Sequence, residues 1–167
     1  MNNHPKSLPA NNTGQPEIDA FDLSILKSLQ EDCQQSSQAL AQKIALSPTA
    51  IQRRIKRLRA DGVIKAEQAV LDAEKFGSYL RLIVMLRLQR GGREINAKFQ
   101  QSLSEIKEIQ QSYAVAGEFD YVLMLLVKNM SDYERIGRDF FQNNDMVERY
   151  QTTVVMEVLE QSLKIPL

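Results

Sequence analysis

Apolar residues recur at helical spacing along one short segment in the first half of the chain. They are Ile51, Ile55 and Leu58. At about 100° per residue these side chains share one face, so we expect a helix over residues 48–60 that packs along this face. Ser47 suits the N-cap of the helix, Pro48 suits its first position, and Gly62 marks its end.

The opposite face of this predicted helix is polar and basic. On it lie Thr49, Arg53 and Lys56, with Gln52 and Arg57 at its edges. Between residues 47 and 65 six cations stand against one acid, a net charge of +5, although the whole chain has 21 of each. Such a concentration of positive charge favours a polyanionic partner. The alternatives are a solvated surface and an amphipathic helix that binds calmodulin or a membrane surface.

The segment upstream predicts two further helices, one after Asp19 and a short one after Ser36 or Ser37. Their apolar positions are Ile18, Phe21, Ile25, Leu26, Leu29 and Cys33 in the first, and Ala39, Leu40 and Ile44 in the second. We expect Cys33 to be a small core residue. Two helices followed by a tight turn and a capped basic helix form a helix-turn-helix, which favours DNA as the partner. Beyond Gly62 a polar–apolar alternation up to Leu71 predicts a strand or wing.

The second half of the chain alternates between strands and helices. The predicted elements are a strand over Leu80–Leu88, a helix over Glu94–Leu103, strands over Ile109–Val115 and Phe119–Val127, a helix from Ser131 to about Asn143, and a strand over Val147–Leu159. Ser131 and Glu134 have the spacing of a capping box, which starts the second of these helices. The order β-α-β-β-α-β is the ferredoxin-like arrangement, so the fold class is α+β.

A sheet of this kind covers one face with its own two helices and leaves the other face open. Strands as apolar as those around Ile83 and Met124 cannot leave that face to water, so we expect two copies of the chain to dimerise through it. A two-fold axis would also pair the basic helices, which is the arrangement that reads a palindromic DNA site.

Composition narrows the alternatives. Hydrophobic and charged residues make up 43% and 25% of the 167 residues, which is typical of a globular protein. The single cysteine excludes an internal disulfide, and the single histidine, His4, excludes a histidine cluster, so we predict neither a metal site nor catalytic residues. No apolar run is long enough to span a membrane, and we expect a cytoplasmic, nucleoid-associated protein without a cofactor.

We divide the chain into four parts on these patterns. Residues 1–16 are expected to form a disordered tail, residues 17–65 the helix-turn-helix domain, residues 66–78 a wing and linker, and residues 79–167 the ferredoxin-like domain.

Several ordered motifs connect this chain to a known family. They are IDAFDLSIL at 18–26, LSPT followed by RRIKRL, DGVI at 61–64, GEFDYVL at 117–123 and the closing TTVVMEVLEQSLKIPL. With these motifs the chain resembles the Lrp/AsnC, or feast/famine, transcription regulators from about Ile18 to Leu167. The resemblance implies a winged helix-turn-helix that binds double-stranded DNA, followed by a RAM-type domain that binds an amino-acid effector and assembles dimers into tetramers or octamers.

The candidate DNA-binding residues follow from the geometry of the basic helix. Its outward face directs Thr49, Gln52, Arg53 and Lys56 toward base edges, where arginine can pair with guanine through two hydrogen bonds. Arg54, Arg57 and Arg59 are better placed for phosphates, with simple solvation as the alternative. Ser47 and Pro48 complete the set at the start of the helix.

The candidate effector residues centre on a predicted turn. Gly117 permits a positive φ or a close backbone approach, and Asp120 can accept an ammonium group or order the turn. The resemblance adds the neighbours Glu118 and Phe119, and Tyr113, Ala114, Met130, Thr153 and Val154 around the family's pocket or response surface. The alternative is a hairpin turn with core-filling neighbours.

Two functions remain open on this basis. The first is a sequence-specific regulator of amino-acid metabolism that responds to an amino acid bound between dimers. The second is an architectural protein that compacts DNA without a specific effector. An enzyme based on Glu118 and Asp120 as an acid and base pair lacks a nucleophile.

Overall fold

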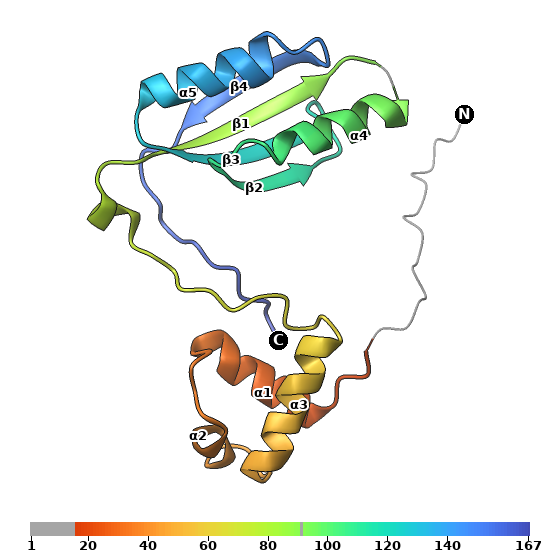
Figure 1. Ribbon diagram of the computed structural model, residues 1–167, viewed down its shortest axis with the longest axis vertical. Coiled ribbons are helices and arrows are strands. Elements are labelled where there is room, and N and C mark those ends of the chain that lie inside the picture. The colour runs from red at the N-terminus through yellow and green to blue at the C-terminus, as the bar shows by residue number, and fades with distance from the viewer. Residues whose placement is uncertain (1–15, 91) are drawn as a thin grey trace. The chain divides into compact units, whose positions relative to one another are not determined.

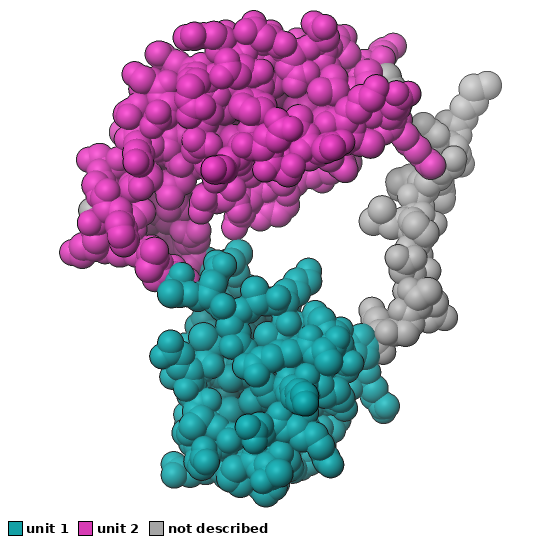
Figure 2. Space-filling model, in the orientation of Figure 1, with its two compact units in different colours: residues 1–69, 162–167 teal, residues 70–161 magenta. Residues whose placement is uncertain are grey.

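The structure is a computed structural model that describes residues 16–90 and 92–167. The chain divides into two compact units (Figures 1 and 2). Unit 1 consists of residues 1–69 and 162–167, and unit 2 of residues 70–161. The expected tail over residues 1–16 falls almost wholly outside the described residues.

The described part of unit 1 contains three helices, α1 (Ala20–Glu31), α2 (Ser37–Ala41) and α3 (Pro48–Ala60). Each begins at a side-chain cap: Asp19, Ser36 and Ser47 accept hydrogen bonds from backbone N–H groups of the first turns. The core of the unit is formed by Ile25, Leu40, Ile44, Ile51 and Ile55. The predicted helix-turn-helix is therefore confirmed.

Two details after α1 and α3 differ from the expectation. Cys33 is exposed, because α1 ends at Glu31 and the cysteine lies in the following turn rather than on the apolar stripe. Residues 65–72 form no strand. A strand needs a partner for its backbone groups, and Val70 and Leu71 are 92% and 68% exposed, so the alternation there does not mark a buried face. A short 3₁₀ turn, Ala73–Phe76, follows at the start of unit 2.

Unit 2 is a four-stranded antiparallel sheet with two helical segments. In chain order its elements are β1 (Leu80–Leu88), α4 (Gly92–Leu103), β2 (Ile109–Ala114), β3 (Tyr121–Val127), α5 (Met130–Ile136) with a π-helical continuation (Gly137–Gln142), and β4 (Val147–Val154). The spatial order is β2-β3-β1-β4, with every pair antiparallel. The ferredoxin-like α+β fold is confirmed (Figure 1).

The boundaries in unit 2 correct two expectations. Helix α5 is capped by Asn129, whose side chain accepts from the Asp132 N–H, and not by Ser131. Strand β4 ends at Val154, opposite Leu82, because its partner β1 begins only two residues before Leu82. Residues 162–167, at the end of the predicted second domain, group with unit 1 by their contacts. There the Gln30 side chain donates to the Ile165 carbonyl at 3.0 Å and accepts from the Ile165 N–H at 2.6 Å.

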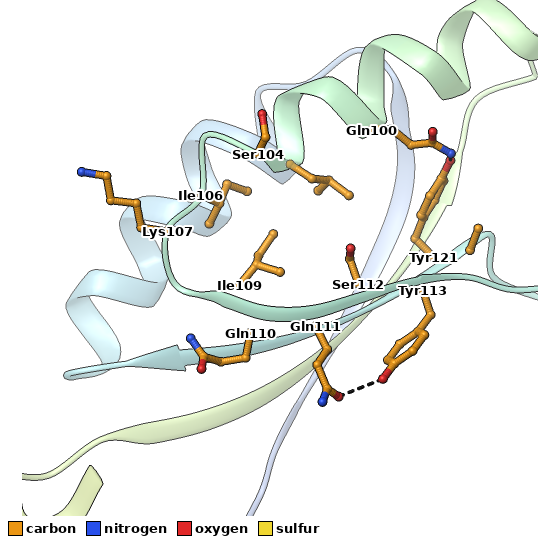
Figure 3. Close-up of a pocket in the computed structure, with 12 residues that line it drawn as sticks. Gln100, Ser104, Ile106, Lys107, Ile109, Gln110, Gln111, Ser112, Tyr113 and Tyr121 are labelled. Atoms are coloured by element: carbon orange, nitrogen blue, oxygen red, sulfur yellow. Dashed lines mark hydrogen bonds between the residues drawn. The ribbon is translucent and has the colours of Figure 1, made fainter. Parts of the chain in front are cut away.

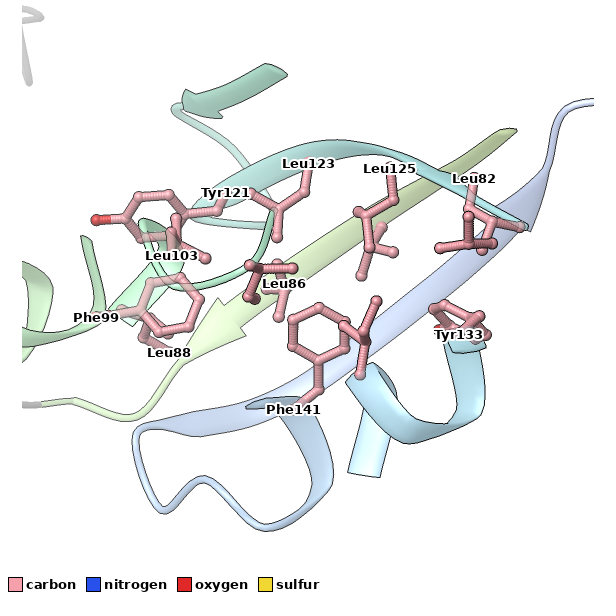
Figure 4. Close-up of a cluster of buried hydrophobic side chains, with 14 residues drawn as sticks. Leu82, Leu86, Leu88, Phe99, Leu103, Tyr121, Leu123, Leu125, Tyr133 and Phe141 are labelled. Carbon is pink, nitrogen blue, oxygen red and sulfur yellow. The ribbon is translucent and has the colours of Figure 1, made fainter. Parts of the chain in front are cut away.

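The two faces of the sheet differ in what covers them. One face packs against α4, α5 and the π-helical segment through a large apolar cluster (Figure 4), whose buried members include Leu86, Phe99, Leu123 and Phe141. The apolar side chains that alternate with this cluster along β1 and β3 lie on the opposite face. These residues are Ile83, Met85, Val122, Met124 and Leu126, all half-buried. The chain therefore presents an apolar sheet face that its own helices do not cover.

Candidate DNA-binding surface and effector region

The outward face of α3 carries the polar side chains that the sequence placed there. Thr49, Gln52, Arg53 and Lys56 are exposed, while Ile51, Ile55 and Leu58 are buried on the opposite face. Ser47 does not project as a free hydroxyl, because its Oγ accepts from the Ala50 N–H at 3.2 Å. Pro48 occupies the first helical turn, as predicted. The helix is thus held by its buried apolar face and its cap, and the hydrogen-bonding side chains of its polar face point outward.

The cations of α3 fall into two groups. Arg54 pairs with Asp19 at 2.6 Å and with Asp22 at 2.9 Å. Arg57 pairs with Asp22 at 2.5 Å, and Arg59 pairs with Glu67 at 2.7 Å. Within residues 16–90 and 92–167, Arg53 and Lys56 take part in no ion pair.

This division matters for the expected roles. Arg53 and Lys56, which have no ion pair in the described part of the chain, are the cations that we expect at base edges. The paired cations, Arg54, Arg57 and Arg59, are those that we expect at phosphates. A cation that already has a carboxylate partner must share or lose it to contact a phosphate.

Sequence reasoning missed the carboxylates on α1 that organise this group. Asp22 is fully buried, and it forms a capping box with Asp19, in which each side chain accepts from the other residue's backbone N–H. The hydrogen bonds from the Asp22 backbone and from Arg54 lower the pKa of Asp19, and the same carboxylates raise the pKa of Arg54. The signal was present in the sequence, since two acids three residues apart at a helix start have capping-box spacing.

The predicted effector turn lies between β2 and β3. Gly117 adopts φ +155°, a conformation that favours glycine. The Asp120 carboxylate accepts from the Leu88 N–H at 2.8 Å, and the Asp120 N–H donates to the Leu86 carbonyl at 2.8 Å. Asp120 therefore ties the turn to the end of β1, which is the ordering role that we considered for it.

A residue that the sequence did not single out joins this turn. Arg149 on β4 pairs with Glu118 at 2.7 Å, and its guanidinium carbon lies 5.1 Å from the centre of the Phe119 ring. Both members of the ion pair are largely exposed. Nothing in the sequence pattern marks Arg149, because its place beside the turn depends on the pairing of β4 with β1.

The structure separates the effector candidates into two groups within one chain. Tyr113, Ala114 and the turn residues lie at the end of the sheet where Tyr121 faces Leu86. Met130, Thr153 and Val154 lie at the other end, where Val127 faces Leu80 and Val154 faces Leu82. From Leu82 to Leu86 the strand rises roughly 13 Å. A single chain therefore does not gather all nine residues around one ligand.

An open pocket of about 680 Å³ lies between α4 and the outer strand β2 (Figure 3). Tyr113 and Ala114 are among its lining residues, together with Gln100, Lys107, Ser112 and Tyr121. The Tyr113 hydroxyl donates to the Gln111 side chain at 3.0 Å. The pocket is mixed in polarity, and it contains only two of the residues that we expected around the effector.

The described residues contain no cluster of histidine, cysteine, aspartate or glutamate side chains suited to a metal ion. In the same part of the chain no helix is both long and apolar enough to cross a bilayer.

Comparison with known proteins defines the class to which this fold and this basic helix belong. Residues 18–65 match a family model described as a winged helix-turn-helix DNA-binding domain. Residues 81–165 match the Lrp/AsnC ligand-binding domain. A DNA-binding helix-turn-helix joined to a ligand-binding domain defines a transcriptional regulator, and proteins of this class are not enzymes. The chain belongs to the Lrp/AsnC family.

Individual relatives match this chain along most of their own length. An uncharacterised HTH-type transcriptional regulator of Sinorhizobium fredii is 35% identical, over 90% of this chain and 89% of its own. The leucine-responsive regulatory protein of Haemophilus influenzae is 34% identical, over 87% of each chain. Among solved structures, an AsnC-family transcriptional regulator from Agrobacterium tumefaciens superimposes with a TM-score of 0.81 at 28% identity, covering 89% of this chain and 96% of that one.

Proposed function

We propose that this regulator binds DNA as a homodimer whose two α3 helices read a two-fold symmetric site, and that an amino acid modulates this binding. The observation that carries the proposal is the division of the α3 cations. Arg53 and Lys56 face outward without an ion pair among the described residues. Thr49 and Gln52 lie beside them. Free donors on one exposed helix face are what base readout in the major groove requires.

The open face of the sheet supports the dimer. Five apolar side chains on β1 and β3 lie there without a covering helix. Covering this face with the same face of a second copy is an isologous contact, and it generates the two-fold axis that the paired helices need. Further association of dimers into tetramers or octamers, and a nucleoid-associated location in the cytoplasm, extend the same proposal.

The effector part of the proposal is supported by relatives and by the placement of the candidate residues. The transcriptional regulator NMB0573 from Neisseria meningitidis, similar in fold with a TM-score of 0.83, is described as a complex with L-Met. In this chain the candidates lie at two ends of the sheet, so a site between copies can combine one end of each. Tyr113, Gly117 and Phe119 would then come from one chain, and Met130 and Thr153 from another.

Two measurements test this function. Footprinting on the DNA upstream of the protein's own gene, with and without each amino acid, should show discrete protection that one amino acid changes. Thermal unfolding with the same amino acids should show a higher midpoint for that one, because a ligand that binds only the folded state stabilises it. Uniform protection that no amino acid alters would instead support DNA compaction.

The roles on α3 have their own test. Arg53→Ala should weaken binding to the protected site far more than to random DNA, since a base contact carries sequence preference. Equal losses on both DNAs would contradict base reading by Arg53. Lys56→Ala should behave in the same way.

A further inference from the structure

The carboxylate of Asp22 occupies an unusual position in unit 1. It lies in the first turn of α1 and is fully buried. Its Oδ1 accepts from Arg54 Nη1 at 2.9 Å, and its Oδ2 accepts from Arg57 Nη2 at 2.5 Å. The Asp19 N–H also donates to Oδ2, at 3.1 Å. Burying a carboxylate without a partner costs free energy, so Asp22 must stay paired with the two arginines. Their guanidinium groups are therefore held where the Asp22 carboxylate lies.

The two arginines are related by helix geometry. Arg54 and Arg57 are three residues apart and lie on the same side of α3. Arg53 and Lys56 each precede one of these arginines by one residue, and are therefore rotated from them by about 100° around the helix axis. Fixing the direction of the Arg54 and Arg57 pair fixes the direction in which Arg53 and Lys56 point.

The two arginines differ in how exposed they are and in how many N–H donors remain available to a phosphate. The Arg54 side chain is 22% exposed, it also pairs with Asp19, and its guanidinium carbon lies 5.6 Å from the centre of the Phe21 ring. The Arg57 side chain is 44% exposed and retains donors that Asp22 does not use. Arg57 can therefore contact a phosphate while it holds Asp22, whereas Arg54 is occupied on several sides.

We propose that Asp22 is a positioning residue for DNA recognition, which sets the rotation of α3 through Arg54 and Arg57 and withdraws Arg54 from phosphate contact. The inference rests on the proposed base-reading role of Arg53 and Lys56. It changes our expectation for Arg54, which we had assigned to phosphates from its charge alone. Arg54 and Arg57, which Asp22 holds from α1, are thus the immediate neighbours of Arg53 and Lys56 on α3.

The test uses the full chain and two duplexes of equal length, one selected by this protein from a random pool and one scrambled. Binding to each is measured over a series of salt concentrations. In Asp22→Asn both arginines lose their shared carboxylate, and Arg54 keeps only its partly exposed pair with Asp19. Binding to the scrambled duplex should therefore strengthen, and its salt slope should steepen by up to about 0.9, the value of one added phosphate contact. The preference for the selected duplex should fall about tenfold. A residue that only stabilises the fold would weaken both bindings together.

Three variants separate the effect of charge from that of position. Asp61→Asn changes the net charge by the same amount, but Asp61 is exposed and lies 4.0 Å from Arg57, so the preference for the selected duplex should persist. Arg54→Gln should lower the preference and leave the salt slope on the scrambled duplex unchanged. Arg54→Lys should restore part of the preference, because an ammonium can keep one carboxylate partner.

Three results would overturn the proposal. One is an Asp22→Asn protein that keeps its preference; another is an Asp61→Asn protein that loses it equally. The third is an Arg54→Gln protein whose salt slope decreases by about one contact. Should Asp22→Asn fail to fold, judged by circular dichroism, the Arg54 variants decide alone. An Arg53→Gln protein with unchanged preference would contradict the proposed base reading itself, which is a separate failure.

Discussion

The DNA-binding helix of unit 1 and the β2–β3 turn of unit 2 both carry ion pairs, but in opposite settings. Asp22 is fully buried, and both of its oxygens accept from arginines. Glu118 and Arg149 are 67% and 46% exposed. A buried charge tolerates little movement of its partners, because separation leaves it without either water or a counter-ion. An exposed pair contributes little and can rearrange.

The difference corresponds to what each region is proposed to do. A helix that reads bases needs one orientation, since hydrogen bonds to base edges depend on distance and direction. A turn that receives a ligand needs room to adjust, and the Gly117–Asp120 turn is fixed mainly by the hydrogen bonds of Asp120 to β1. Buried charge therefore accompanies the helix proposed to read DNA, and exposed charge accompanies the turn proposed to receive the effector.

The largest effect should come from the core of unit 2, on which the turn depends. Leu123 is fully buried in the sheet, so Leu123→Ala should lower the free energy of unfolding by about 2–5 kcal/mol. Urea unfolding followed by circular dichroism measures the loss. A change below about 1 kcal/mol would mean that the core repacks freely and that the turn has no rigid support.

The two ion pairs should differ clearly in how much they contribute to the stability of the protein. Asp22→Ala should cost about 2 kcal/mol, less than for a fully buried pair because both arginines reach solvent. Glu118→Ala should cost less than about 1 kcal/mol, as exposed pairs do. Urea unfolding of both variants compares them directly. Equal costs would remove the contrast between the two regions.

The open face of the sheet allows a test of assembly apart from folding. Met124→Asp should weaken dimerisation at least about tenfold, a difference of about 1.4 kcal/mol, because it places a charge in an apolar contact. Sedimentation velocity at several concentrations measures the change. Gln101→Asp, on the exposed side of α4, adds the same charge and should leave the dimer intact. Dissociation by both variants would argue against this face as the interface.

The smallest effect should be a pH dependence at the start of α1. The pKa of Asp19 is lowered from 3.8 by its hydrogen bonds with the Asp22 backbone and with Arg54. Its stabilising effect is therefore complete above that unfolded-state value and is lost as the pH falls through the folded-state pKa. Asp19→Asn keeps a capping oxygen but removes the charge. Its stability should differ from that of the parent protein above about pH 5, and the difference should shrink below about pH 4. A difference that is independent of pH would exclude this charge effect.

Much of the fold was predictable because it follows from local patterns. Helix α3 appeared from three apolar residues at helical spacing, a cap and a terminal glycine, and the alternation of strands and helices predicted the ferredoxin-like order. The predictions failed where a segment has the right local pattern but no other segment packs against it. Residues 65–71 alternate like a strand but have no neighbouring strand to pair with, and Cys33 follows the apolar spacing beyond the end of its helix.

The sequence by itself determined the elements, their order, the basic face of α3 and the family. Only the tertiary structure decided which of the cations on α3 have an ion pair among the described residues. The pairing of Arg54 and Arg57 depends on Asp19 and Asp22, more than thirty residues away at the start of α1. The tertiary structure also decided that the effector candidates lie at two ends of the sheet, and that Arg149 joins one of them. Helical and strand periods act within a few residues, whereas ion pairs and strand register are set by packing between distant segments.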